Sequence, residues 1–218
     1  MLRGLEGILY LMVWIVNHWV CPVRRTAARI VHAMPILSTT KMTAEQFLQL
    51  GEDPPGVRLE LVEGEIAVSP SPTPIHAFAE MRLSLLLGNH IEANDLGELY
   101  RDVDTILYPL TVRRPDILFY SKARTHLVGE KAMHGPPDLA IEIISPSSAE
   151  IDRTDKFAEY RDAGVAYYWI VDPAAKTIEA WRLDKGQYIP AGRGKQSEVV
   201  QLPPFVDLPI PLSRLWRS

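Results

Sequence analysis

The chain has 218 residues, of which 47% are hydrophobic and 23% charged, and its formal net charge is −4. This composition is typical of a globular protein and excludes long disorder, and the acidic balance excludes nucleic-acid binding by bulk positive charge alone. The single cysteine, Cys21, excludes an intramolecular disulfide and a cysteine zinc cluster, which favours a reducing, cytoplasmic location.

Residues 1–41 differ from the rest of the chain and form an N-terminal extension in our interpretation. An apolar stretch at 8–16 favours a membrane anchor, but Asn17 and His18 interrupt it early. A signal peptide is a second interpretation, although no clear small-residue cleavage site follows. We favour a third, a start codon placed too far upstream. Membrane association is expected only if the stretch belongs to the protein.

One domain is predicted over residues 42–218, and its first half alternates between helices and strands. Turn signals and periodicity predict elements at these positions: a short helix at 42–50, a hairpin at 57–70 that turns at Glu63–Gly64, a long amphipathic helix at 75–94, and strands at 98–108 and 114–120.

The second half continues the same alternation. The predicted elements are a buried strand at 138–144, a helix with capping-box residues Ser147 and Glu150 that ends at Gly164, a strand at 166–171, a hairpin at 177–191 and an extended Pro-rich tail. This order predicts an α/β or α+β fold, with a mixed β-sheet core flanked by helices and additional β-hairpins.

A carboxylate in an apolar strand is the most informative feature of this domain. Glu142 lies within "PDLAIEIISPSS", a run of the kind that is buried on both faces of a sheet. An unpaired charge there is costly, so it needs a cation, a metal or a route to water. Asp116 opens the preceding strand, and Lys156 lies on the following helix. If the strands are neighbours, these three side chains lie close together.

Two carboxylates and a lysine suit phosphodiester hydrolysis. Paired acidic oxygens bind a hard cation such as Mg²⁺, with Mn²⁺ as a substitute. The metal polarises the phosphoryl oxygen and lowers the pKa of a bound water. Lys156 would then orient that water or neutralise developing charge.

At these residues the sequence resembles a known family. The segments "RLELVEGEI", "SPSPTPIH", "RPD", "DLAIEIISPSS" and "DRTDKFAEYRDAGVAYYWIVDP" are similar to the bacterial Uma-two family of restriction-endonuclease-like proteins, which is placed in the PD-(D/E)xK nuclease superfamily. The resemblance covers about residues 42–216. It implies a restriction-endonuclease-like fold and a metal-dependent nuclease core, with Asp116 and Glu142 as metal ligands.

The resemblance also adds residues and one departure. In the superfamily pattern a lysine follows the glutamate by two residues, but Ile144 stands there, and Lys156 on the next helix matches the place of the lysine within the family. Glu60 and His76 are implied as outer members of the site.

A Mg²⁺-dependent endonuclease that cleaves DNA is therefore the first functional hypothesis, and a homodimer is the expected assembly because two sites cut a duplex most easily. Cations close to the site in sequence are the candidates for phosphate contacts: Arg113, Arg114, Lys122, Arg124 and Lys131. The alternative is a catalytically inactive nuclease-fold protein that binds nucleic acid or a partner, since a fold alone does not prove chemistry.

Each residue also has a purely structural interpretation. Asp116 can be a strand-start residue, and Glu142 can pair with Arg113 or Arg114. Lys156 can be a helix-face lysine paired with Asp152, and His76 a polar helix-start residue. Glu60 can point outward from its hairpin, and Glu80 on the long helix is an alternative carboxylate that we rank below it.

Overall fold

The computed structural model describes residues 41–146 and 148–217, so the expectations for the N-terminal apolar stretch and for Ser147 lie outside the described residues. The helices in this part are α2 (Ala44–Phe47), α3 (Pro74–Ala93), α4 (Ala149–Arg153) and α5 (Asp155–Ala163), with 3-10 turns η1 (Thr125–Leu127) and η2 (Leu212–Arg214). None of these helices combines the length and apolarity that crossing a bilayer requires.

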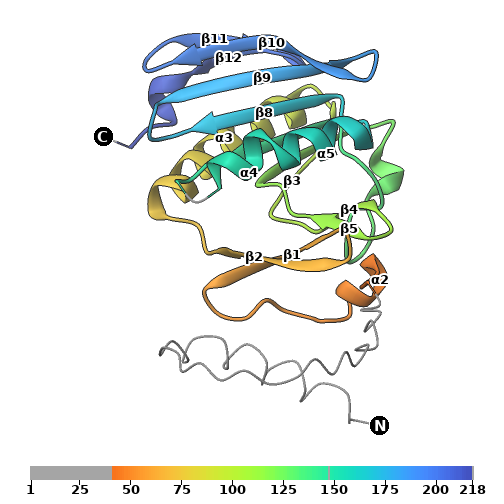
Figure 1. Cartoon of the computed structure of the whole chain (residues 1–218). Helices are drawn as coiled ribbons and strands as arrows, with labels where there is room; N and C mark the ends of the chain where they lie inside the picture. The colour runs from red at the N-terminus through yellow and green to blue at the C-terminus, as the bar shows by residue number, and fades with distance from the viewer. Residues whose placement is uncertain (1–40, 147, 218) are drawn as a thin grey trace, which may run out of the picture. The chain divides into compact units, whose positions relative to one another are not determined.

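The strands of the described residues form three sheets (Figure 1). In chain order the strands are β1 (Val57–Val62), β2 (Glu65–Pro70), β3 (Gly97–Arg101), β4 (Thr105–Tyr108), β5 (Thr111–Arg113), β6 (Ile117–Ser121), β7 (Leu139–Ile143), β8 (Tyr167–Asp172), β9 (Thr177–Asp184), β10 (Gln187–Lys195), β11 (Val199–Leu202) and β12 (Phe205–Pro211). The sheets have the orders β2-β1-β5-β4, β10-β9-β8-β7-β6-β3 and β11-β12.

The six-stranded sheet is mixed, as predicted. β7 and β8 are parallel and are joined by α4 and α5, whereas β6–β7 and β8–β9 are antiparallel. The β6–β7 register pairs Ile117 with Ile141, so Asp116 comes opposite Glu142 at the end of the ladder. The expected proximity of these two strands is therefore confirmed.

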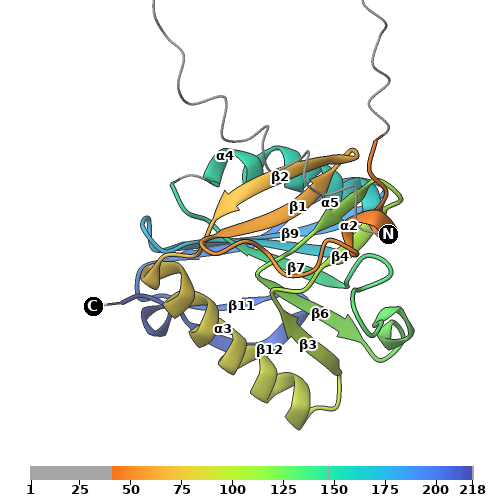
Figure 2. The same ribbon diagram turned by 90° about the horizontal axis from the view of Figure 1, so that it is seen from below.

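Helices cover both faces of this sheet (Figure 2). On one face, α3 begins at the capping residue Thr73 with Pro74 at its first position, and it packs Leu83 and Leu87 against the sheet. On the other face, α5 ends at Gly164, which has the left-handed φ of +84° that favours glycine.

Strand β7 is buried on both faces, which is what its apolar sequence predicts. Leu139, Ile141 and Ile143 belong to the core beneath α3, whereas Ala140 and Ile144 belong to the core beneath α5. Because side chains alternate along a strand, Glu142 projects toward α5. The position of the carboxylate is thus set by the strand period.

Two predicted elements are each divided in the structure. The segment 98–108 forms β3 and β4, which belong to different sheets, because Asp102 adopts a positive φ of 54° between them. The helix predicted up to Gly164 forms α4 and α5, which meet at Thr154, and α4 begins after Ser148, whose side chain makes no capping hydrogen bond. Alternating apolar residues and good helix formers do not reveal such breaks, which depend on the packing of the segments on either side.

Candidate active site

A cavity of about 320 Å³ opens beside the carboxyl end of β7. Residues of β1 and β2, the start of α3, the segment before β6, and α4 and α5 line it, so both larger sheets contribute. Its polar lining consists of four carboxylates, Glu60, Asp116, Glu142 and Asp152, together with Arg58, His76, Arg114, Lys156, one threonine and several serines.

Asp116 is held by three donors at the entrance to β6. Its Oδ2 accepts hydrogen bonds from Ile143 N at 2.7 Å and from His76 Nε2 at 3.0 Å, and its Oδ1 accepts one from Arg58 Nη1 at 3.1 Å. Burial raises the pKa of Asp116, but the hydrogen bond and charge of His76 and the charge of Lys156 outweigh it, so the pKa is lowered. The side chain is therefore an oriented, ionised carboxylate and not a simple turn residue.

Glu142 is almost fully buried, and two donors converge on its Oε1. Lys156 Nζ lies at 3.0 Å, and the hydroxyl of Tyr160 donates at 2.6 Å. Burial raises the pKa of Glu142 well above its usual value, opposed by Lys156 and reinforced by the charges of Asp152, Asp116 and Glu60. The pairing with Arg113 or Arg114 considered from sequence is absent, because those arginines bind other carboxylates.

Lys156 reaches the cavity from the first turn of α5, with its ammonium among three acidic groups. Its Nζ lies 3.0 Å from Glu142, 3.3 Å from Asp152 and 3.8 Å from Glu60. Burial lowers the pKa of Lys156, but the surrounding carboxylates, led by Glu142, outweigh this and raise the pKa. The ammonium therefore stays charged. The pairing with Asp152 expected from sequence is confirmed, but Lys156 is buried and is not a solvated helix-face lysine.

Glu60 lines the cavity and does not point outward. Its Oε1 accepts from Arg114 N at 2.8 Å, and its Oε2 accepts from Arg113 Nη1 at 3.1 Å. Burial raises the pKa of Glu60, but the charges of Lys156 and Arg113 outweigh it, so the pKa is lowered. Glu60 thus ties the four-stranded sheet to the segment that carries Asp116.

The assignment of Arg113 and Arg114 to phosphate binding needs correction. Arg113 is 3% exposed, and its guanidinium makes a two-bond pair with Glu159 at 2.6 and 2.7 Å in addition to its bond with Glu60. Arg114 lines the cavity, but its guanidinium pairs with Asp53 and Asp104. Neither arginine presents a free cation to an incoming phosphate; Arg113 is structural.

His76 and Glu80 extend the cluster along α3. His76 Nε2 contacts Asp116, and its buried Nδ1 has no hydrogen bond but lies 3.9 Å from Glu80 Oε2. Glu80 Oε1 is bound by Arg101 at 2.6–2.7 Å, and burial raises the pKa of Glu80. Glu80 does not line the cavity, which agrees with its ranking below Glu60.

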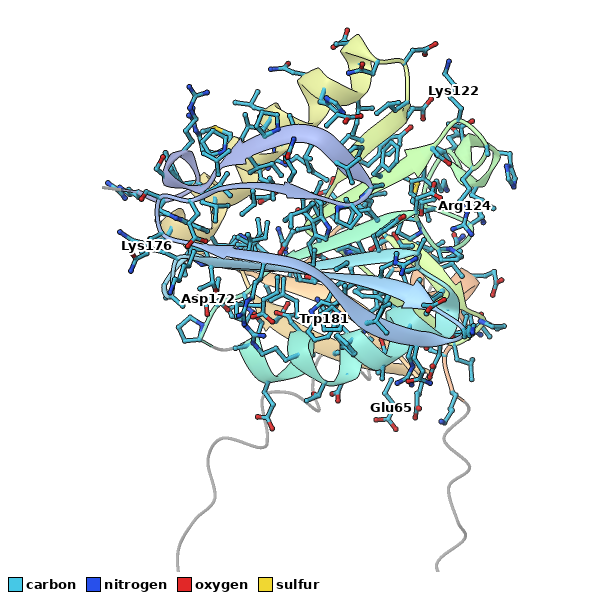
Figure 3. The ribbon with its side chains drawn as sticks, turned by 90° about the horizontal axis from the view of Figure 1, so that it is seen from above. Glu65, Lys122, Arg124, Asp172, Lys176 and Trp181 are labelled. Carbon is cyan, nitrogen blue, oxygen red and sulfur yellow. The ribbon has the colours of Figure 1, made fainter. Side chains whose placement is uncertain are left out.

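Lys122 and Arg124 lie at a different end of the molecule. Figure 3 places both far from Asp172 and Lys176, which flank the carboxyl end of β8 next to the end of β7. Lys122 pairs with Asp95, and Arg124 Nη1 donates to the Pro136 carbonyl at 2.8 Å. Neither lines the cavity, so their assignment to phosphate binding on the basis of sequence proximity is also corrected.

Two members of the site were missed or underrated from sequence. Arg58 binds Asp116 and also pairs with Asp102 at 3.1 Å. It stands two residues before Glu60 on β1, and that spacing places both side chains on one face of a strand, so the signal was available. Asp152 was treated only as a partner of Lys156, yet it is 1% exposed and lines the cavity.

The residue types at this cavity fit a hard divalent cation. Asp116 and Glu142 offer carboxylate oxygens, the ligands that Mg²⁺ and Mn²⁺ prefer. Within residues 41–146 and 148–217, no three His, Cys, Asp or Glu side chains form a ready-made metal-binding group. Mg²⁺ typically needs only one or two protein carboxylates, because it keeps waters and takes oxygens from a bound phosphate. A cation beside Glu142 would also favour its ionised form.

Comparison with known proteins identifies the family of this chain. A family model, Uma2, described as "Putative restriction endonuclease", matches residues 44–213. The chain belongs to the Uma2 family. A search of curated proteins found no match to this Uma2 protein.

The fold of this Uma2 protein recurs in a solved structure. A "putative nuclease belonging to DUF820" from Anabaena variabilis superposes with a TM-score of 0.65 at 20% sequence identity, covering 80% of this chain and 97% of that one. The type IIG restriction endonuclease BpuSI gives a TM-score of 0.35 at 15% identity, covering 64% of this chain and 15% of that one. The first likeness shows that the fold is that of a nuclease-like protein.

Tyr160 provides a first testable prediction. Tyr160→Phe keeps the buried ring and removes the hydroxyl that donates to Glu142. Because the acceptor is a buried carboxylate, we expect the free energy of unfolding to fall by about 1.5–3 kcal/mol in urea titrations. Tyr188→Phe is the matched control, since its hydroxyl donates to the Val165 carbonyl at 2.9 Å, and we expect a loss of about 1 kcal/mol. Equal losses in the two variants would contradict a special role for the Tyr160–Glu142 bond.

Proposed function

We propose that this Uma2 protein is a Mg²⁺-dependent endonuclease that hydrolyses phosphodiester bonds in DNA. One observation carries the proposal: Asp116, Glu142 and Lys156, which come from three separate elements, meet in one cavity. Burying three ionisable side chains together costs desolvation free energy, and clusters of this kind are found most often at functional sites. The family and the likeness to a nuclease structure support the same reaction class.

The acidic residues would hold the cation. Arg58, His76 and the backbone of Ile143 hold both oxygens of Asp116, so the orientation of this carboxylate is fixed. Glu142 would complete the pair from the neighbouring strand. When bound, Mg²⁺ supplies Lewis acidity that polarises the phosphoryl oxygen and lowers the pKa of water.

Lys156 would act on the charge that develops during hydrolysis. Its ammonium stays protonated among the carboxylates, so it can stabilise negative charge on the phosphoryl group as attack proceeds. Arg58 lines the same cavity, but its guanidinium pairs with Asp102 and Asp116, so it would act by orienting Asp116. His76 would act through Asp116 by fixing its orientation.

A specific observation favours the alternative of an inactive binding protein. Asp116 and Glu142 already have protein donors, namely Arg58 and His76 for the first and Lys156 and Tyr160 for the second. Such a network can be satisfied without a metal ion. The two functions differ in whether a divalent cation has any effect.

Plasmid cleavage tests the proposal. We expect the purified full-length chain to convert supercoiled plasmid to nicked and linear forms with Mg²⁺ or Mn²⁺ and to leave it intact in EDTA. Linear product at early times would indicate cutting of both strands, as expected of a homodimer. Asp116→Asn is expected to lower the rate on the order of 10²-fold or more, because it removes a ligand charge.

Asp207→Asn is the matched control, since Asp207 is exposed on β12 and does not line the cavity. Its cleavage rate is expected to equal that of the unaltered chain. Cleavage that is independent of metal, equal cleavage by both variants, or no cleavage with either metal would reject the catalytic assignment. A binding role would then be the better description.

A further inference from the structure

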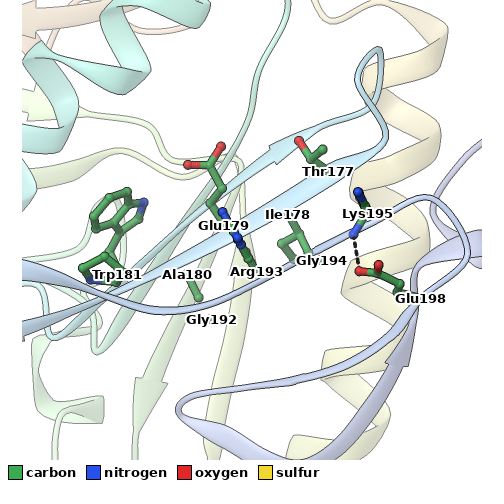
Figure 4. A pocket seen from close by; sticks show the side chains of 11 residues that line it. Thr177, Ile178, Glu179, Ala180, Trp181, Gly192, Arg193, Gly194, Lys195 and Glu198 are labelled. Atoms are coloured by element: carbon green, nitrogen blue, oxygen red, sulfur yellow. Dashed lines mark hydrogen bonds between the residues drawn. The ribbon is translucent and has the colours of Figure 1, made fainter.

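A second and larger cavity lies on the hairpin formed by β9 and β10, and we call it the hairpin cavity. It measures about 680 Å³ (Figure 4). The side chains that matter for its chemistry are Thr177, Glu179, Trp181, Arg193, Lys195 and Glu198. None of these residues lines the candidate active site, so the cavity is a separate feature of the surface.

A β-bulge determines which side chains face this cavity. The β9–β10 register shifts between Pro190 and Gly192, after which Arg193 pairs with Glu179 and Lys195 with Thr177. Without the extra residue, Arg193 would stand opposite Ile178, whose side chain is in the core. The bulge therefore turns Arg193 and Lys195 toward the cavity face. Bulges commonly re-aim side chains next to functional sites.

The cavity and the candidate active site occupy the same face of the six-stranded sheet. Glu142 on β7 pairs with Ile170, Ile170 with Glu179, and Glu179 with Arg193, which makes one cross-strand row. Paired residues on neighbouring strands project to the same face, and strands are about 4.8 Å apart, so Arg193 lies about 14 Å from Glu142 along the sheet. Nucleotides rise 3.4 Å each along a strand, so this distance corresponds to about four nucleotides.

Helix α4 connects the two cavities. Ile151 and Asp152 line the candidate active site, whereas the next residue, Arg153, pairs at 2.8 Å with Glu179 in the hairpin cavity. This ion pair neutralises one of the two acidic groups of the hairpin cavity. A ligand that extends along this face would pass from one cavity to the other across a single turn of helix.

The charges of the hairpin cavity favour an anion. Arg193 and Lys195 are exposed, and within the described part of the chain neither has an ion pair. The other acidic group, Glu198, accepts a hydrogen bond from Lys195 N through its Oε2 at 2.9 Å and so terminates the strand. Cations on an edge strand also discourage aggregation, but that role requires no particular face and no bulge.

We propose that the hairpin cavity binds the phosphate backbone of the nucleic-acid substrate a few nucleotides from the phosphodiester held in the active site. Arg193 and Lys195 are the phosphate contacts. This inference rests on the proposed function for the identity of the ligand. It gives the acidic chain the local basic surface that binding a polyanion requires, in place of the arginines and lysines expected from sequence.

The test measures binding separately from cleavage. Fluorescence anisotropy of labelled single-stranded and duplex DNA, with the full-length chain in EDTA, gives Kd at several salt concentrations. For Arg193→Ala/Lys195→Ala we expect Kd to rise at least about 10-fold, and the slope of log Kd against log salt to fall by about 1.4 for single strands or about 1.8 for duplex. Both residues are exposed, so the fold should survive, which the thermal unfolding midpoint checks.

Arg182→Ala/Lys185→Ala is the matched control, because it also removes one arginine and one lysine from the surface, and neither lines either cavity. Unchanged Kd and slope are expected for it. An equal loss in both double variants, an unchanged Kd in the first, or no binding by the unaltered chain would overturn the inference. If binding changes as expected while no metal supports cleavage, the hairpin cavity stands and the catalytic assignment fails.

Discussion

Glu142→Gln is expected to abolish cleavage while leaving the protein folded. The amide has the shape of the carboxylate but lacks the charge that would bind a divalent cation, so we expect cleavage to fall on the order of 10³-fold or more. Burial raises the pKa of Glu142 and so disfavours its charged form. Lys156 keeps Asp152 at 3.3 Å and Glu60 at 3.8 Å, so its ammonium is not left without a buried counter-charge, and we expect the free energy of unfolding to stay within about 1 kcal/mol of the unaltered chain.

Plasmid cleavage at saturating Mg²⁺ and urea unfolding of the same preparation measure the two effects. Glu150→Gln is the control, because Glu150 is exposed on α4, and we expect full activity from it. A Glu142→Gln protein that still cuts at a tenth of the normal rate or more would show that Glu142 is structural. Mg²⁺ that stabilises the Glu142→Gln variant against urea as much as it stabilises the unaltered chain would point to the same conclusion.

Lys156→Met should produce the largest loss of stability. The ammonium lies within 3.8 Å of Glu142, Asp152 and Glu60, and its removal leaves these acidic groups buried without it. Breaking a buried ion pair in this way typically costs about 3–5 kcal/mol, and we expect a loss of that size in urea unfolding at neutral pH. Cleavage should be lost as well.

The pH dependence of this loss has a definite sign. The charge of Lys156 lowers the pKa of all three carboxyls in the folded state. Without the ammonium these folded-state pKa values rise relative to the unfolded ones, so the folded state binds protons more readily. Stability of the variant is therefore regained as the pH falls toward about 5 and lost as it rises. Lys131→Met, at an exposed position, is expected to unfold like the unaltered chain at every pH. A deficit that stays constant with pH would contradict the electrostatic explanation.

The sequence predicted those parts of the fold that depend on local pattern. The apolar run of β7, the turn at Glu63–Gly64 and the helix end at Gly164 are all in place, since each follows from burial or from a backbone conformation that glycine tolerates. The switch between sheets after β3 was not predicted. Its residues alternate like those of a continuous strand, and only the separate pairings of β3 with β6 and β4 with β5 divide them.

The site residues that could be predicted from sequence are those whose charge or spacing sets them apart from their neighbours. Glu142 stands out because its strand is otherwise apolar, and Lys156 because it follows at helical spacing from Asp152. The phosphate contacts were not predictable from proximity in sequence. Arg113, for example, is close to Asp116 in sequence, but its guanidinium is bound by Glu60 and Glu159. The bulge that re-aims Arg193 is likewise a property of strand pairing, which no local pattern encodes.

The position of Lys156 on a helix has a consequence for how the site comes into being. Ile144, which stands where the superfamily pattern would have a lysine, is free to pack in the core beneath α5. The ammonium instead arrives only when α5 docks on the sheet, because the helix carries it across the polypeptide to Glu142. The strands alone therefore hold an acidic cluster without its cation. The Lys156–Glu142 pair therefore forms only in a chain whose helix α5 has packed against the sheet, which makes the composition of the site depend on tertiary structure.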